Sequence, residues 1–118
     1  MSDFLRTPET SREYREYRAN DNLKNECPLC NREAIKVFSH WKVMVNLFPY
    51  DKIASRHDML VPLRHVTDAE LTTDEKEELA IIRASFVQEY DYIIEATVKT
   101  KSIPQHFHLH LIVGKQIV

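Results

Sequence analysis

Residues 102–112 of this 118-residue chain read SIPQHFHLHLI and hold three of its six histidines. Along an extended strand, residues two apart share a face, so His106, His108 and His110 are predicted to lie on one side. The alternate residues are all apolar and predict the side that faces the core: Phe107, Leu109 and Leu111. A shift of one residue would exchange the two sides, so this pattern specifies the register of the strand.

Three histidines within five residues are hard to explain as an ordinary polar strand face, for which Thr, Lys or Glu are commoner choices. One alternative is that all three bind a single metal ion. However, the outer two Cα atoms lie about 13 Å apart on an extended strand, whereas each nitrogen ligand of zinc must approach the ion to about 2 Å. The spacing therefore favours different roles for the three imidazoles.

Length and composition predict a single domain, since 43% of the residues are apolar and 29% are charged. A net charge of −2 argues against a general nucleic-acid-binding protein, which usually carries a basic surplus. No apolar run approaches the roughly 20 residues that cross a bilayer, and the charged N-terminus lacks the apolar core of a signal peptide. We therefore expect a cytoplasmic protein with no membrane or nucleic-acid partner.

The remaining pattern predicts an α+β fold, a mainly antiparallel sheet with one long helix packed on it. Residues 1–25 are expected to form a polar arm with a short helix through Tyr14, Tyr17 and Arg18, or to be partly disordered, and 26–118 the catalytic domain. Strands are predicted at 34–38, 41–47, 58–61, 92–98 and 107–113. A capping box at 72–75 opens the helix, and its apolar stripe consists of Leu79, Ile82, Phe86 and Tyr90.

The run from His106 to Ile112 matches the histidine-triad signature His-φ-His-φ-His-φ-φ at every position, and the chain resembles that family. Two upstream segments extend the resemblance: 45–49, similar to the segment with the ribose-binding acid or amide, and 57–65, similar to the His-x-Leu-Val-x-Pro-x-x-His segment. The resemblance covers roughly residues 26–116. It implies the fold of the histidine-triad superfamily and, for many relatives, a homodimer.

The resemblance also implies a nucleotide hydrolase in which His108 attacks the α-phosphate and forms a nucleotidyl-histidine intermediate. Neutral imidazole can do so near pH 7 because its ordinary pKa is about 6.5. Substrates of this class are nucleoside phosphoramidates and (di)nucleoside polyphosphates. His110 resembles the triad member that contacts the phosphate or leaving group, and His57 resembles an upstream histidine that either orients the triad or acts as an acid.

Histidine at the third triad position is typical of hydrolase branches, whereas transferase branches carry glutamine there. By resemblance, Asn46 binds the ribose, Leu47 lines the base pocket and Ser102 donates to a phosphate oxygen. Asn46 is alternatively a turn residue. Two other functions remain open: a nucleotidyltransferase with phosphate or a sugar phosphate as acceptor, and a catalytically weak, zinc-stabilised nucleotide-binding module.

Cys27 and Cys30 have the spacing of a metal knuckle, which supplies only half of a zinc site. The resemblance to zinc-containing bacterial members implies that His65 and His106 complete a structural Zn²⁺ site. His40 is an alternative ligand to His65. The cysteines are otherwise a redox pair, although the flanking elements of such a motif are missing, or two unpaired thiols.

The loop before the triad, residues 97–104, contains no glycine, although relatives usually place glycines there to bind phosphate. Lys99 and Lys101 either replace that function with positive charge or are simply solvated. The source of positive charge for a bound phosphate is therefore an open question at the level of the sequence.

Overall fold

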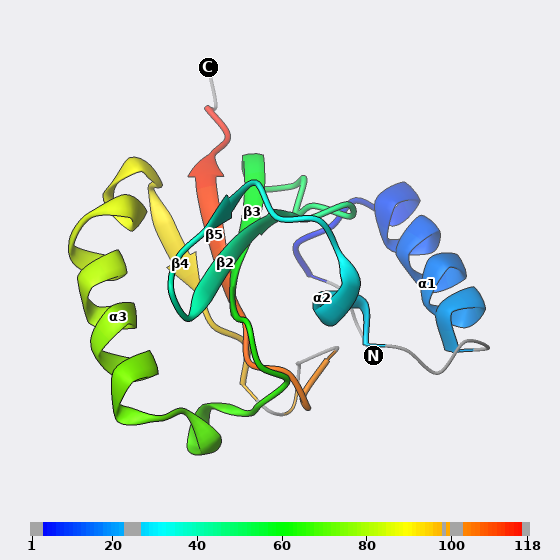
Figure 1. Cartoon of the computed structure of the whole chain (residues 1–118). Helices are drawn as coiled ribbons and strands as arrows, with labels where there is room; N and C mark the ends of the chain where they lie inside the picture. The colour runs from blue at the N-terminus through cyan, green and yellow to red at the C-terminus, as the bar shows by residue number, and fades with distance from the viewer. Residues whose placement is uncertain (1–3, 23–26, 98, 100–102, 117–118) are drawn as a thin grey trace.

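A computed structural model describes residues 4–22, 27–97, 99 and 103–116, and Figure 1 shows a central sheet with helices on both sides. The strand order is β1-β2-β3-β5-β4 and every neighbouring pair is antiparallel, which confirms the predicted α+β class. The strands are β1 (Lys36–Val37), β2 (Trp41–Val45), β3 (Ala54–Pro62), β4 (Tyr92–Ile94) and β5 (Leu109–Gly114). The helical elements are α1 (Pro8–Asn22), α2 (Pro28–Asn31), η1 (Asp68–Glu70), α3 (Thr73–Ala84) and η2 (Phe86–Glu89).

The strand lengths differ from the predicted ones because central and edge strands pair differently. β3 is longer than expected, since it pairs with β2 along one side and with β5 along the other. The edge strands β1 and β4 are shorter than predicted. β5 begins only at Leu109, because the backbone N–H of Phe107 donates to the carbonyl of Val66, which lies outside the sheet. His106 and His108 therefore precede the strand, and only His110 lies within it.

α3 begins at the predicted capping box: Thr72 accepts from the N–H of Glu75, and the Glu75 carboxylate accepts from the N–H of Thr72. The helix ends at Ala84, so the prediction that Phe86 and Tyr90 continue its apolar stripe is wrong. Ser85 leaves the helical conformation, and its hydroxyl donates to the carbonyl of Ile81, an alternative partner for the backbone. A 3₁₀ turn then brings Phe86 against the same core.

Two apolar clusters cover the two faces of the sheet. The cluster on the α3 side contains the predicted apolar set of the triad segment: Phe107, Leu109 and Leu111. The opposite cluster lies beneath α2 and includes Leu29, Met44, Met59, Val61 and Ile103. The histidine face is therefore buried as well, and His106, His108 and His110 are 0%, 3% and 4% exposed.

α1 is held against the sheet by the turn that follows β2. The Asp51 carboxylate accepts hydrogen bonds from the N–H of Thr7 (2.7 Å), the hydroxyl of Thr7 (3.0 Å) and the hydroxyl of Thr10 (2.6 Å). Farther along the helix, the rings of Tyr14 and Tyr17 pack on Phe48. In Figure 1, α1 and α2 lie on the side of the sheet opposite α3.

No helix in the described part of the chain combines the length and apolarity needed to span a bilayer.

Candidate functional site

His108 is fixed in one tautomer by a hydrogen bond to the backbone. Its Nδ1 lies 2.9 Å from the carbonyl oxygen of His106. Because a carbonyl can only accept, Nδ1 carries the hydrogen, and Nε2 is the basic nitrogen of the neutral ring. The local backbone therefore selects the form of imidazole in which Nε2 is a nucleophile.

His57 and His110 form a chain of hydrogen bonds that begins and ends at Tyr50. The N–H of Tyr50 donates to Nδ1 of His57 (3.0 Å), so His57 carries its hydrogen on Nε2. That group donates to Nδ1 of His110 (2.8 Å), which leaves the hydrogen of His110 on Nε2, 3.1 Å from the Tyr50 hydroxyl oxygen. Both rings of this chain are neutral, and each has a defined tautomer.

Burial accounts for the neutral state of both rings. Burial, followed by the positive charge of Arg6, lowers the pKa of His57 to about 3. Burial also lowers the pKa of His110 well below its ordinary value, with contributions from His57 and His108. Neither ring is expected to be protonated at pH 7, in agreement with the hydrogen-bond chain.

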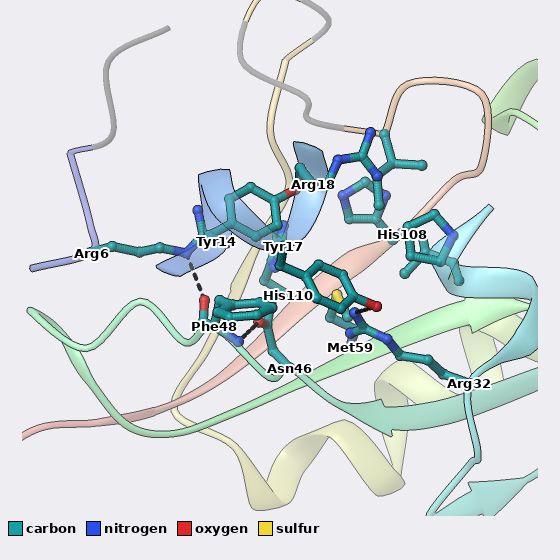
Figure 2. Close-up of a pocket in the computed structure, with 13 residues that line it drawn as sticks. Arg6, Tyr14, Tyr17, Arg18, Arg32, Asn46, Phe48, Met59, His108 and His110 are labelled. Carbon is teal, nitrogen blue, oxygen red and sulfur yellow. Dashed lines mark hydrogen bonds between the residues drawn. The ribbon is translucent and has the colours of Figure 1, made fainter. Parts of the chain in front are cut away.

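His108 and His110 line a cavity of about 30 Å³ between α1, the region around α2 and the sheet (Figure 2). Its other lining residues come mainly from α1, from α2 and from the end of β2 and the turn after it. They are Arg6, Tyr14, Tyr17, Arg18, Pro28, Leu29, Arg32, Asn46, Phe48, Met59 and Ile103. Among the described residues, the lining contains three arginines and no carboxylate, a composition suited to an anion.

Of the three residues predicted to bind a nucleotide, one lines the cavity, one does not, and one lies outside the described residues. Asn46 lines the cavity, and its Oδ1 accepts from the N–H of Phe48 (2.8 Å), so it also makes the turn that the alternative interpretation describes. Leu47 is 56% exposed and is absent from the lining, where Phe48 stands instead. Ser102 lies outside the described residues. The role of all three in nucleotide binding stays a prediction.

Cys27, Cys30, His65 and His106 converge on one point and can bind a metal ion. One ligand atom of each lies within 4.8 Å of those of the others. Nδ1 of His106 is 3.2 Å from Nδ1 of His65, 3.4 Å from Sγ of Cys30 and 3.5 Å from Sγ of Cys27. A tetrahedral zinc site requires separations of about 3.3 Å between nitrogens and about 3.6 Å between nitrogen and sulfur. The four residues therefore fit such an ion.

The partners of the cluster orient its ligands. Nε2 of His106 donates to the carbonyl of Pro62 (3.1 Å), which leaves the basic Nδ1 directed at the sulfur atoms. Desolvation, followed by the adjacent Cys27 thiol, raises the pKa of Cys30 to about 11. A bound cation would reverse that effect, because metal ligation favours the thiolate. The alternative ligand His40 is not one of the four residues that converge here.

Several residues of the site were not identified from the sequence. Three further residues of the site lie in segments with no motif: Tyr50, Arg6 and Arg32. They come together only because α1 and residues 27–32, which we call the knuckle, fold over the sheet. The spacing of Tyr14, Tyr17 and Arg18 gave a partial signal, since residues three and four apart share one face of a helix. Nothing in the sequence indicated which surface that face would contact.

The fold is similar to that of two solved histidine-triad structures. The structure of a HIT-family hydrolase from Legionella pneumophila Philadelphia 1 matches it with a TM-score of 0.56 and 22% identity, over 79% of this chain and 96% of that one. A histidine-triad protein from Clostridium difficile matches with a TM-score of 0.53 and 16% identity, over 83% of this chain and 90% of that one. Neither a protein-family model nor a curated protein matches the chain.

Proposed function

We propose that the chain is a nucleotide hydrolase in which Nε2 of His108 attacks the α-phosphorus of a nucleoside phosphoramidate or a (di)nucleoside polyphosphate. The observation that carries this proposal is the 2.9 Å hydrogen bond from Nδ1 of His108 to the His106 carbonyl, together with the position of His108 in the lining of the arginine-rich cavity. The likeness to a HIT-family hydrolase supports the same class of activity.

The reaction proceeds in two displacements. In the first, the bond from Nε2 to phosphorus forms, the bond from phosphorus to the leaving group breaks, and the leaving group departs with the electron pair. In the second, water attacks phosphorus and the bond from Nε2 to phosphorus breaks, with its electron pair returning to the ring. The proton that water loses passes to the leaving group of the first step or to solvent, and nucleoside monophosphate and neutral His108 result. The carbonyl of His106 stabilises the positive charge that the ring carries while it is bonded to phosphorus.

His110 and His57 are proposed to have unequal roles. His110 lines the cavity, and its Nε2–H can turn from the Tyr50 hydroxyl to a phosphoryl or leaving-group oxygen. His57 is not in the lining, and its two nitrogens contact Tyr50 and His110. His57 therefore acts as a positioning residue that sets the tautomer of His110. Histidine at position 110 favours water as the acceptor, and transfer to phosphate or a sugar phosphate is the alternative outcome.

We further propose that the metal site holds a structural zinc ion. Two thiolates and two imidazoles are its preferred donor set, and four protein ligands leave no open position for a substrate. The ion would fix the knuckle and His106, whose carbonyl holds His108. The cytoplasmic location and the homodimer stay predictions.

Mass spectrometry of protein quenched during turnover tests the proposed mechanism. We expect a nucleoside monophosphate adduct on His108, and we expect His108→Ala to abolish the adduct and the release of nucleoside monophosphate. Nucleotide binding without turnover in the unmodified chain would support the binding-module alternative. A phosphorylated product that requires added phosphate or sugar phosphate would support the transferase.

A further inference from the structure

Among the described residues, the positive charge of the cavity comes from the N-terminal arm and from Arg32, next to α2. Arg6 precedes α1, Arg18 lies on α1 and Arg32 follows α2, and all three line the cavity with His108. The chain as a whole carries a net charge of −2, so this concentration of arginines is local. In the loop before the triad, Lys99 is exposed and does not line the cavity, and Lys101 lies outside the described residues.

The three arginines differ in their contacts. Arg6 donates to the carbonyl of Phe48 (2.6 Å) and stacks on the ring of Tyr14, and Arg32 donates to the hydroxyl of Tyr17 (2.9 Å). These contacts hold both guanidinium groups in the walls of the cavity. Arg18 is half-buried, and within the described part of the chain no carboxylate pairs with it. A half-buried guanidinium with no such partner favours an anion from outside the chain.

The orientation of Arg18 follows from its position on the helix. Tyr14, Tyr17 and Arg18 occupy one face of α1, and the two rings pack on Phe48, which turns that face toward the sheet. Figure 2 shows the Arg18 side chain reaching from α1 toward His108. The guanidinium and the imidazole therefore approach the cavity from two different walls, one on α1 and one at the sheet.

This arrangement indicates which part of a substrate Arg18 contacts. In an in-line displacement at phosphorus, the leaving group departs on the side opposite the nucleophile. With His108 on the sheet side, the leaving group is directed toward α1 and Arg18. An arginine there stabilises a leaving group that carries phosphate oxygens, and it offers nothing comparable to a neutral amine.

We propose that Arg18 binds the phosphate chain of the leaving group, so that the preferred substrates are nucleotides with a further phosphate beyond the one attacked by His108. This inference rests on the proposed function. It makes the N-terminal arm a part of the substrate site that determines specificity, and it assigns the anion-binding role to α1, because the loop before the triad has no glycine.

The small volume of the cavity limits how a polyphosphate can bind. A volume of about 30 Å³ is small for a polyphosphate, so we expect side chains of α1 to move outward when one binds. The Arg18 side chain can do this without unfolding α1, because it has several rotatable bonds and no partner in the described residues that must be broken. The guanidinium then closes over the bound anion.

Binding of inorganic tripolyphosphate, measured by titration calorimetry, tests the anion site without any need for turnover. We expect the full chain to bind it and Arg18→Ala to bind it at least about tenfold more weakly, the loss of one charge-assisted hydrogen bond. Arg18→Lys should be intermediate, because it keeps the charge but not the planar fork. Arg12→Ala removes the same charge from an exposed position of α1 and should bind like the unmodified chain. Equal binding by Arg18→Ala, or an equal loss in Arg12→Ala, would overturn the proposal.

Hydrolysis of diadenosine tetraphosphate and of adenosine phosphoramidate by the same variants tests specificity. We expect Arg18→Ala to lower the ratio of kcat/KM for the polyphosphate over that for the phosphoramidate by about tenfold or more. If the unmodified chain hydrolyses neither compound, the proposed function fails, and the calorimetry alone decides for or against an anion site at Arg18. If both are hydrolysed and Arg18→Ala leaves the ratio unchanged, the proposed function stands and the role of Arg18 is wrong.

Discussion

At the scale of single residues, the site depends on which nitrogen of each imidazole carries the hydrogen. The backbone sets all of these choices, since the His106 carbonyl fixes His108, and the N–H of Tyr50 fixes His57 and through it His110. A protein that must attack phosphorus at neutral pH needs a neutral ring with its lone pair at a defined atom. The three rings therefore already have the tautomers that the proposed reaction requires.

His57→Ala tests whether His57 positions His110 or acts as an acid. Without His57, Nδ1 of His110 loses its donor, and kcat should fall about tenfold, because one hydrogen bond of about 1.4 kcal/mol corresponds to a factor of ten. KM should change little, and the acidic limb of the pH–rate profile should remain. His57→Gln, whose amide can still donate to His110, should recover most of the activity. A glutamine variant as slow as the alanine variant, with that limb lost, would identify His57 as the acid.

The sequence pointed to the histidines and cysteines that the structure brings together and to Asn46, which lines the cavity, but not to most of the other lining residues. Alternation placed His106, His108 and His110 on one side, and the apolar partners of these residues pack as expected. Tyr50 and Arg18 could not be assigned, because their positions depend on contacts between segments distant in sequence, such as the 3.1 Å contact of Tyr50 with His110. The near-complete burial of the imidazoles has the same cause, since the elements that cover them are α1 and α2.

At the scale of the elements, local capping signals were more reliable than hydrophobic periodicity. Thr72 and Glu75 form the predicted capping box. Hydrogen bonds from Arg64 to the Glu75 carboxylate, partly offset by desolvation, lower the pKa of Glu75 to about 2. The stripe beyond Ala84 was misassigned because Phe86 reaches the same core from a 3₁₀ turn. A hydrophobic pattern with a period of 3.6 residues indicates which residues are buried, but it does not require that all of them belong to one helix.

The contact of Asp51 with the start of α1 predicts a pH-dependent docking of the arm. Burial raises the pKa of Asp51, but the hydrogen bonds from Thr10 and Thr7 outweigh it, so the net pKa lies below the ordinary value of 3.8. A folded-state pKa below the unfolded value stabilises the docked arm above that ordinary value, and the contribution is lost as the pH falls through the lowered pKa.

Asp51→Asn should therefore loosen α1 at neutral pH, and amide hydrogen exchange should become faster in residues 8–20 while β3 and β5 stay protected. In the unmodified chain the protection factors of the same amides, in which the intrinsic pH dependence of exchange cancels, should fall only below about pH 4, the ordinary range of an aspartate. Glu13→Gln removes the same charge from an exposed position of α1 and should change neither measurement. If Asp51→Asn left exchange in α1 unchanged, the other contacts of the arm, such as those of Tyr14 and Tyr17 with Phe48, would suffice to hold the helix.

At the scale of the whole molecule, the metal cluster joins three segments that are distant in sequence. Cys27 and Cys30 flank the start of α2, His65 follows β3, and His106 precedes β5. His106 belongs to the cluster and its carbonyl fixes His108, so a bound ion would connect the packing of the knuckle to His108, the proposed nucleophile. The knuckle in turn contributes Pro28, Leu29 and Arg32 to the cavity.

Removal of the metal should accordingly affect both stability and activity. We expect elemental analysis to find one zinc ion per chain, and a chelator should lower Tm by about 10 °C, since a ligand at a hundred times its Kd adds roughly 2.7 kcal/mol. Cys27→Ser should lose the zinc and lower kcat, because His106 is no longer held. His40→Ala should keep both, because His40 lies outside the cluster. Full retention of zinc in Cys27→Ser, or its loss in His40→Ala, would show that the ion is held by a different set of ligands.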